Sequence, residues 1–279
     1  MMLKSKTSSP AKINLFLYVI GRDERGYHIL QSLFHTVPSL NDIISIEINN
    51  SGECTMTSNT IINDNLVTKA AKNILQLTQN ERYGVKIHLE KNIPIGAGLG
   101  GGSSNAATTL IEINRLLNLN LSTAQLIDIS SGIGDDIKFF LMQQKCVYFD
   151  GQNHHKIGIN QPLNILLVKP NFSISTAEVF RLYREQFLHS ELQPIVEKEK
   201  ILQHILNGDN HLYNIVKKIQ PKILDVIDEL QIHKGIMSAR MSGSGSACFG
   251  IFEDYKTLKI AKNRISELYP EWFLHDFLI

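Results

Sequence analysis

The chain has 279 residues, of which 43% are hydrophobic and 20% are charged. This balance is typical of folded proteins that bury a core, and at about 100–200 residues per domain the length favours two domains or one large one. The 28 Lys and Arg residues nearly balance the 27 Asp and Glu residues, which leaves a formal net charge of +1. The charge therefore gives no reason to expect nucleic acid as a partner.

Cysteine usage and apolar runs limit the class of protein further. Cys54, Cys146 and Cys248 are odd in number and widely spaced, which argues against a disulfide framework or a zinc site and favours a reducing compartment. The beginning of the chain, MMLKSKTSSP, lacks the apolar stretch of a secretory signal. The longest apolar runs, such as residues 15–20, are far shorter than the roughly 20 residues of a membrane helix. We therefore expect a cytoplasmic protein without a membrane partner, and the sequence does not indicate an oligomeric state.

Hydrophobic periodicity predicts strands and helices in mixed order. Alternating apolar and polar residues predict strands at residues 11–21, 32–37, 43–48 and 85–90. Apolar residues at helical spacing predict two helices, one that begins at Asn65 and runs to residue 77, and one that begins at Ser104 and runs to residue 117.

The second half of the chain continues this mixture. The polar stretch 151–162 interrupts the pattern, so we place a boundary near residues 158–162 and expect two lobes, 1–160 and 161–279. Beyond the boundary the predicted elements are a strand at 163–168, helices at 176–188, 210–218, 221–230 and 254–268, and a strand–turn–strand unit at 238–252. The order shows no regular βαβ repeat, so the predicted fold class is α+β.

Glycine clusters in two short windows, with five residues in 96–102 and three in 243–250. The first window lies in PIGAGLGGGSS, residues 94–104, between a predicted strand and a predicted helix. A glycine-rich backbone that leads into a helix start presents free N–H groups and the positive end of the helix dipole to a phosphate group. Ser103 and Ser104 can cap this helix or turn a hydroxyl group toward phosphate or Mg²⁺.

Three other interpretations of the loop are weaker. Gly96, Gly98 and Gly101 match the spacing of a dinucleotide-binding fingerprint, but no acidic residue follows about 20 residues later. A Walker A loop is excluded because Gly102 stands where its lysine belongs. A loop without a ligand would not explain three consecutive glycines, which cost backbone entropy. We interpret the loop as a phosphate site whose positive charge comes from Mg²⁺, the helix dipole and a basic residue elsewhere in the chain.

Three segments in matching order resemble the motifs of the GHMP kinases: PAKINLFL at 10–17, PIGAGLGGGSSNAA at 94–107 and MSGSGSACFGIF at 241–252. The resemblance extends from Ser9 to Phe252. It implies a two-lobed GHMP kinase fold, with an N-terminal lobe like ribosomal protein S5 domain 2 and a ferredoxin-like C-terminal lobe. It also implies an ATP:alcohol phosphotransferase, with ATP as co-substrate and Mg²⁺ as cofactor.

The triple-glycine loop, together with PAKINL and Gly26-Tyr27-His28, is similar to members of this family that phosphorylate the 2-hydroxyl group of a cytidine-diphosphate-linked methylerythritol, in non-mevalonate isoprenoid precursor synthesis. The small-molecule partner would then be this cytidine derivative. Two alternatives stay open at this point. One is a GHMP kinase of the homoserine or mevalonate type, and the other is a catalytically silent nucleotide-binding module.

The resemblance assigns Lys12 and Asp136 as catalytic residues. Asp136 would accept the proton of the acceptor hydroxyl group, and Lys12 would keep this carboxylate ionised. Without the motifs, Asp136 would be part of a solvated acidic turn and Lys12 a surface lysine. Two departures from the family pattern occur here, because Lys138 replaces a usual proline and Asp135 offers a second carboxylate.

The resemblance also assigns binding residues, although it identifies no ligand for Mg²⁺. For ATP these are Pro94, Ile95, Gly96, Ala97, Gly98, Leu99, Gly100, Gly101, Gly102, Ser103 and Ser104. For the substrate they are Asn14, Tyr27, His28, Gly243, Ser244 and Gly245. Tyr27 would stack on the pyrimidine and His28 would bond its polar edge.

Two parts of the substrate site stay open. Residues 243–246 would bind the diphosphate or brace the glycine loop, or they form an ordinary hairpin turn. A second stacking aromatic is expected near Asn210, where the sequence has none, and Tyr213 is the alternative.

Overall fold

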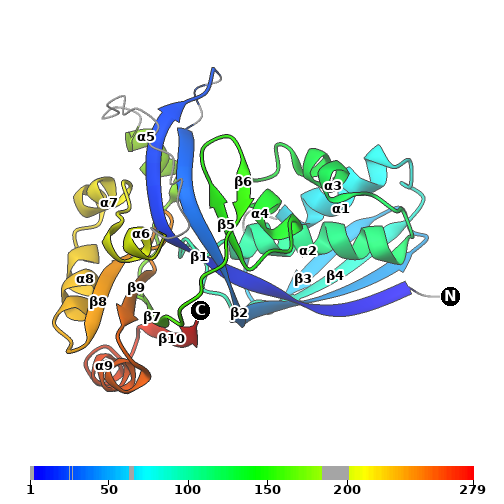
Figure 1. Ribbon diagram of the computed structural model, residues 1–279. Helices are drawn as coiled ribbons and strands as arrows, with labels where there is room; N and C mark the ends of the chain where they lie inside the picture. The colour runs from blue at the N-terminus through cyan, green and yellow to red at the C-terminus, as the bar shows by residue number, and fades with distance from the viewer. Residues whose placement is uncertain (1–2, 25, 27, 63–65, 184–200) are drawn as a thin grey trace. The chain divides into compact units, whose positions relative to one another are not determined.

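The computed structural model describes residues 3–24, 26, 28–62, 66–183 and 201–279 (Figure 1). The chain divides into two compact units. Unit 1 comprises Met1–Ala11, Thr36–Ile93 and Gly100–Gln144, and unit 2 comprises Lys12–His35, Pro94–Leu99 and Lys145–Ile279. A boundary between two lobes near residue 160 stays a prediction.

Two long strands contribute residues to both units. They are β1 (Leu3–Arg22) and β2 (His28–Asn49), which pair with each other. Residues 3–8 of β1 alternate between half-buried and exposed, whereas residues 11–17 are all buried. Alternation is expected where only one face of a strand is covered, and continuous burial where both faces are. Strand β2 contains both of the predicted strands, 32–37 and 43–48, and Pro38 lies near its middle.

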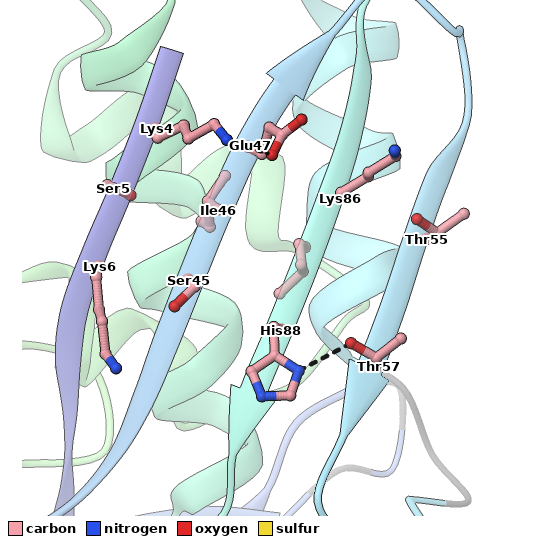
Figure 2. Close-up of a pocket in the computed structure, with 11 residues that line it drawn as sticks. Lys4, Ser5, Lys6, Ser45, Ile46, Glu47, Thr55, Thr57, Lys86 and His88 are labelled. Atoms are coloured by element: carbon pink, nitrogen blue, oxygen red, sulfur yellow. Dashed lines mark hydrogen bonds and ion pairs between the residues drawn. The ribbon is translucent and has the colours of Figure 1, made fainter. Parts of the chain in front are cut away.

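In unit 1, helices cover one face of a sheet in which β2, β4 (Gly84–Glu90) and β3 (Cys54–Ser58) lie side by side. Strand β4 is antiparallel to β2 and parallel to β3. The other face of the sheet is open and polar, and Figure 2 shows Lys4, Lys6, Lys86 and His88 on it. The helices are α1 (Leu66–Leu77), α2 (Gly101–Leu116), α3 (Thr123–Ser130) and α4 (Ile137–Leu141).

In unit 2, residues 32–35 of β2 pair with β5 (Cys146–Phe149), which pairs with β6 (His154–Lys156). A second sheet has the antiparallel order β10-β7-β9-β8. Its strands are β7 (Asn164–Lys169), β8 (Ile236–Met241), β9 (Cys248–Phe252) and β10 (Phe273–Leu278). The helices of unit 2 are α5 (Thr176–Tyr183), α6 (Ile201–Asn207), α7 (Tyr213–Ile219), α8 (Ile223–Gln231) and α9 (Tyr255–Leu268).

One apolar core joins the second sheet to its helices. Leu166 and Val168 of β7 and Phe252 of β9 pack with buried residues of α8 and α9, among them Val226 and Leu258. Burial of these side chains, at about 25 cal/mol per Å² of apolar surface, is the main stabilising contribution in this unit.

The predicted α+β mixture is confirmed, and most predicted elements occur within a few residues of their expected ends. Helix α2 begins at Gly101, three residues before the predicted start, because Gly100 is its N-cap. The short elements β3, β6, β10, α3 and α6 were not predicted. Residues 184–188 of the predicted helix 176–188 lie outside the described residues. Among the helices that the structure describes, none has the length and hydropathy to cross a lipid bilayer.

Candidate active site

The glycine loop is divided between the two units at residues 99 and 100. In its first half, Gly98 has a φ of 72°, in the left-handed region that favours glycine. A Cβ on Gly98 would overlap the carbonyl oxygen of Ser242 and lie 3.0 Å from the backbone nitrogen of Gly245. Position 98 therefore requires glycine for its conformation and also for space.

The turn at residues 242–247 braces this half of the loop. The Ala247 N–H donates to the Ala97 carbonyl at 3.1 Å, and the Gly245 N–H closes the turn on Ser242 at 2.9 Å. The hydroxyl groups of Ser244 and Thr176 are hydrogen-bonded at 2.6 Å. The sequence left open whether residues 243–246 form a hairpin turn or brace the glycine loop, and in the structure they do both. Contact of Gly243, Ser244 and Gly245 with substrate stays a prediction.

The second half of the loop forms the start of α2 in unit 1. Gly100 is the N-cap with a φ of 68°, and its carbonyl accepts from the Ser104 N–H at 2.9 Å. The Ser104 side chain is fully buried, and its hydroxyl oxygen accepts a hydrogen bond from the Ser9 hydroxyl at 2.8 Å. Neither Ser103 nor Ser104 caps the helix, which corrects the capping alternative, because the helix begins before them.

The loop that carries Asp136 lies against this helix start within unit 1. A Cβ on Gly134 would lie 3.6 Å from the hydroxyl oxygen of Ser103, so the loop before Asp136 lies within van der Waals distance of the first turn of α2. Asp136 is half-buried, and it directly precedes α4, whereas Asp135 is exposed. Of the two adjacent carboxylates, Asp136 therefore has the more enclosed position.

Lys138 does not disturb the backbone where the family usually has proline. It is the second residue of α4, and the helix is anchored by Phe139, Phe140 and Leu141, which are all buried. The local apolar pattern is sufficient to form the helix, because the proline would contribute only a fixed φ at its start.

Lys12 is a buried lysine of unit 2, with 3% of its surface exposed. Its Nζ donates to Asn14 Oδ1 at 2.6 Å and to the Gly98 carbonyl at 3.2 Å, and it lies 5.5 Å from the centre of the Phe34 ring. The Lys12 N–H donates to the carbonyl of Leu99 at 2.9 Å. The lysine predicted to complement the lysine-free loop thus contacts the first half of that loop.

Asn14 joins the first motif to the third. Its N–H donates to Ser242 Oγ at 3.1 Å, and its Nδ2 donates to Ser32 Oγ at 2.8 Å. A Cβ on Gly243 would lie 3.2 Å from Asn14 Oδ1 and 3.4 Å from Lys12 Nζ. Lys12, Asn14 and Gly243 are therefore neighbours, while their contacts with substrate stay predictions.

His28 lies at the beginning of β2 beside two aromatic rings of α5 that sequence reasoning missed. Its ring centre is 5.2 Å from that of Phe180 and 5.8 Å from that of Tyr183. A signal existed, since residues three apart share one face of the predicted helix 176–188. Tyr27 lies outside the described residues.

Asn210 is a buried amide that shapes the third motif. Its Nδ2 donates to the carbonyls of Met241 and Gly243, both at 2.8 Å, and its Oδ1 accepts from the Leu212 N–H at 3.0 Å. Tyr213, at the start of α7, is half-buried, and burial raises its pKa to about 12. Position 210 thus has a backbone-bracing amide where a stacking aromatic was expected.

A protein cage for a metal ion is not evident. Within the described ranges, no group of three or more His, Cys, Asp or Glu side chains is placed to hold one. Mg²⁺ does not require such a cage, because it commonly keeps its waters and binds through one or two carboxylates and the phosphates of the nucleotide. Mg²⁺ as cofactor therefore stays a prediction of the family resemblance.

Family models support the assignment that the motifs predicted. The model of the GHMP kinases N terminal domain matches residues 65–144, and that of the GHMP kinases C terminal matches residues 195–271, together more than half of the chain. The chain belongs to the GHMP kinase family. The predicted GHMP kinase fold is thereby confirmed, and members of this family use ATP as co-substrate.

Relatives of this GHMP kinase cover most of its length. A Prochlorococcus marinus (strain MIT 9301) protein named 4-diphosphocytidyl-2-C-methyl-D-erythritol kinase is 38% identical over 277 residues, which cover 92% of this chain and 88% of that protein. A protein of the same name from Nitrosomonas eutropha is 34% identical over 255 residues, which cover 88% and 86%. A crystal structure of 4-(cytidine 5'-diphospho)-2C-methyl-D-erythritol kinase has a TM-score of 0.74 and 28% identity, and the match covers 98% of each chain.

Proposed function

We propose that this GHMP kinase transfers the γ-phosphoryl group of ATP to the 2-hydroxyl group of 4-diphosphocytidyl-2-C-methyl-D-erythritol, in the non-mevalonate synthesis of isoprenoid precursors and in the cytoplasm. The observation that carries the proposal is the 38% identity over 92% of the chain to a kinase named for that substrate. The homoserine and mevalonate alternatives and the silent module are not favoured by this identity.

The triphosphate of ATP would bind along residues 94–104. Two features support this assignment: Gly98 and Gly100 have left-handed backbone, a conformation in which successive N–H groups can converge on an anion, and α2 begins directly after them. The first turn of α2 has no acidic residue that would repel a phosphate group. A Mg²⁺ ion bound to the nucleotide would supply further positive charge at the transferred group.

Asp136 would act as the general base. The acceptor hydroxyl group gives its proton to the Asp136 carboxylate as its oxygen forms a bond to the γ-phosphorus, and the bond from that phosphorus to the bridging oxygen of ADP breaks. The products are the phosphorylated alcohol and ADP. The position of Gly134 against Ser103 supports this role, because it keeps the Asp136 loop at the start of α2.

Lys12 would supply the positive charge that the glycine loop lacks, as the family resemblance implies. Its ammonium group donates to Asn14 Oδ1 and to the carbonyl of Gly98, which is a residue of the glycine loop itself. Both acceptors also fix its position, which matters because phosphoryl transfer depends mainly on positioning and electrostatics.

The cytidine ring would bind near His28 at the beginning of β2. Phe180 and Tyr183, whose rings lie 5.2 and 5.8 Å from that of His28, give aromatic surface on which a pyrimidine can stack. Tyr27 keeps its predicted stacking role, and Phe180 replaces Tyr213 as the proposed second platform.

The test is an acceptor panel with purified protein, ATP and Mg²⁺, in which ADP release is measured. Release is expected with the diphosphocytidyl alcohol, and only background with homoserine, mevalonate, or the same alcohol phosphate without its cytidylyl group. The product should show a new phosphomonoester resonance in ³¹P NMR. Equal turnover of acceptors with and without the cytidylyl group would reject the assigned substrate.

A further inference from the structure

Asp42 is a buried carboxylate of β2 whose two oxygens both bind the segment that leads into the glycine loop. Oδ1 accepts hydrogen bonds from the backbone N–H groups of Asn92 and Ile93, each at 2.8 Å. Oδ2 accepts from Lys91 Nζ at 2.5 Å. The Asp42 side chain is 0% exposed and that of Lys91 is 7% exposed. Burial of a charge is costly unless the charge is paired and hydrogen-bonded, and this carboxylate meets both conditions.

The segment that Asp42 binds lies beyond the end of the β-ladder. The last paired residues of β2 and β4 are Ile43 and Glu90, so the N–H groups after Glu90 need other partners. Asn59 Oδ1 accepts from the Lys91 N–H at 2.8 Å, and Asp42 takes the next two N–H groups. Side chains therefore set the path of the chain as it leaves β4.

Lys91 and Ile93 in turn pack on the first residue of α2. A Cβ on Gly101 would lie 3.0 Å from Lys91 Nζ and 3.1 Å from Ile93 Cγ2. The beginning of a helix carries partial positive charge, so an ammonium group there is unfavourable unless an anion accompanies it. In the contacts that the structure describes, Asp42 supplies this anion.

We propose that Asp42 is a positioning residue for ATP binding. It holds Lys91 and the 91–93 backbone against Gly101, and this contact fixes the backbone of residues 100–104 in the geometry that binds the triphosphate. The inference rests on the proposed function, because it takes residues 94–104 as the nucleotide site. Asp42 acts through Lys91 and the loop, because its own side chain is fully buried.

The test compares D42N and K91M with the unmodified protein well below the unfolding temperature. D42N keeps an oxygen acceptor but removes the charge that holds Lys91. We expect the dissociation constant of a non-hydrolysable ATP analogue, measured by titration calorimetry, and the KM for ATP to rise about 10–100-fold, the effect of losing one charged hydrogen bond. kcat at saturating ATP and the KM for the acceptor should stay near their original values. The double variant D42N/K91M should bind the ATP analogue as tightly as the weaker-binding single variant does, because the two residues act as a unit.

The matched control is E90Q, the same change of carboxylate to amide one residue before Lys91. Glu90 forms an exposed ion pair with Lys6 at 3.0 Å, and E90Q should bind the analogue like the unmodified protein. A folded D42N protein with unchanged analogue affinity overturns the inference, even if its unfolding temperature falls. If D42N does not fold, K91M decides: weaker binding supports the inference and unchanged binding overturns it. The calorimetric comparison needs no acceptor, so failure of the assigned substrate would be seen separately.

Discussion

The ammonium group of Lys12 lies 2.6 Å from Oδ1 of Asn14, two residues further along β1. Side chains two residues apart in a strand share one face, so the motif spacing K-x-N places the pair together. Asn14 Nδ2 donates to Ser32 Oγ, which donates to the Phe16 carbonyl at 2.7 Å. A series of hydrogen bonds through β1 and β2 thus fixes the position of the lysine.

Replacement of Lys12 by Met should lower kcat by about 10²–10³-fold, the usual effect of removing one electrostatic donor at a phosphoryl-transfer site. ATP affinity should change much less, because residues 94–104 keep their N–H groups. Steady-state kinetics and calorimetry with an ATP analogue measure the two effects separately. Lys6→Met is the matched control on the same strand, since Lys6 is exposed and should tolerate the change. Unchanged kcat in K12M would exclude a role for Lys12 in the transfer.

Replacement of Asp136 by Asn should reduce kcat by about 10²–10⁴-fold, because the amide cannot accept the proton of the acceptor hydroxyl group. Asp135→Asn is the matched control, since Asp135 is the adjacent carboxylate and is exposed. Single-turnover phosphoryl transfer at saturating ATP and acceptor measures the effect on the chemical step. If D135N is inactive and D136N retains activity, the catalytic carboxylate is Asp135.

Helices and strands were predictable where apolar residues recur at a constant spacing along the whole element. Strand β4 and helix α9 match their predicted ranges closely because their buried residues recur every two or every three to four positions. The alternation predicts two strands where the structure has β2, and the residues between them include Pro38, Asn41 and Asp42, which are residue types typical of turns. In the structure β2 continues past them, and Asp42 serves to hold residues 91–93.

The candidate site was predictable only where a motif identified it. Asn14 and Ser242 are hydrogen-bonded although they lie 228 positions apart in the sequence. The hydrophobic periodicity of a single strand or helix gives no information about such a contact. Asp42 and Lys91 have the composition of ordinary surface charges, and their pairing over 49 positions depends on the ladder between β2 and β4. Such long-range contacts depend on the strand register, which a single sequence does not specify.

Gly98→Ala should destabilise the protein more than Gly132→Ala, although both glycines have positive φ values, of 72° and 79°. A Cβ on Gly132 would have no heavy atom within 4 Å. Gly132→Ala should therefore lower the free energy of unfolding only through the left-handed conformation, by about 1–2 kcal/mol. A Cβ on Gly98 adds overlap with the Ser242 carbonyl. The free energy of unfolding in urea measures the difference, and ATP-analogue binding should be lost only in G98A. Equal stability losses would show that the loop moves away from Ser242 at little cost.

Asn210→Asp should weaken the third motif, because it replaces an amide that donates to two carbonyls with a carboxylate that repels them. Each buried group left without a partner costs about 1–3 kcal/mol, so the free energy of unfolding should fall by several times the effect of Asn120→Asp. Asn120 is an exposed control that donates one hydrogen bond, to the Asn118 carbonyl at 3.1 Å. Thermal and urea unfolding of the two variants measure the difference, and a similar loss in both would contradict the bracing role of Asn210.

The three thiols should differ in reactivity toward an aromatic disulfide reagent in the folded protein. Burial raises the pKa of the Cys146 thiol to about 12, and burial also raises the pKa of Cys248, which is fully buried. Cys54 is only half-buried, and although burial raises its pKa, the Val85 backbone and Lys72 lower it. The thiolate is the reacting form, so at about pH 8 Cys54 should react first and the other two only on unfolding. Cys54→Ser should abolish the early phase of the absorbance change, and an early phase that persists in this variant would show that Cys146 or Cys248 is accessible in the folded state.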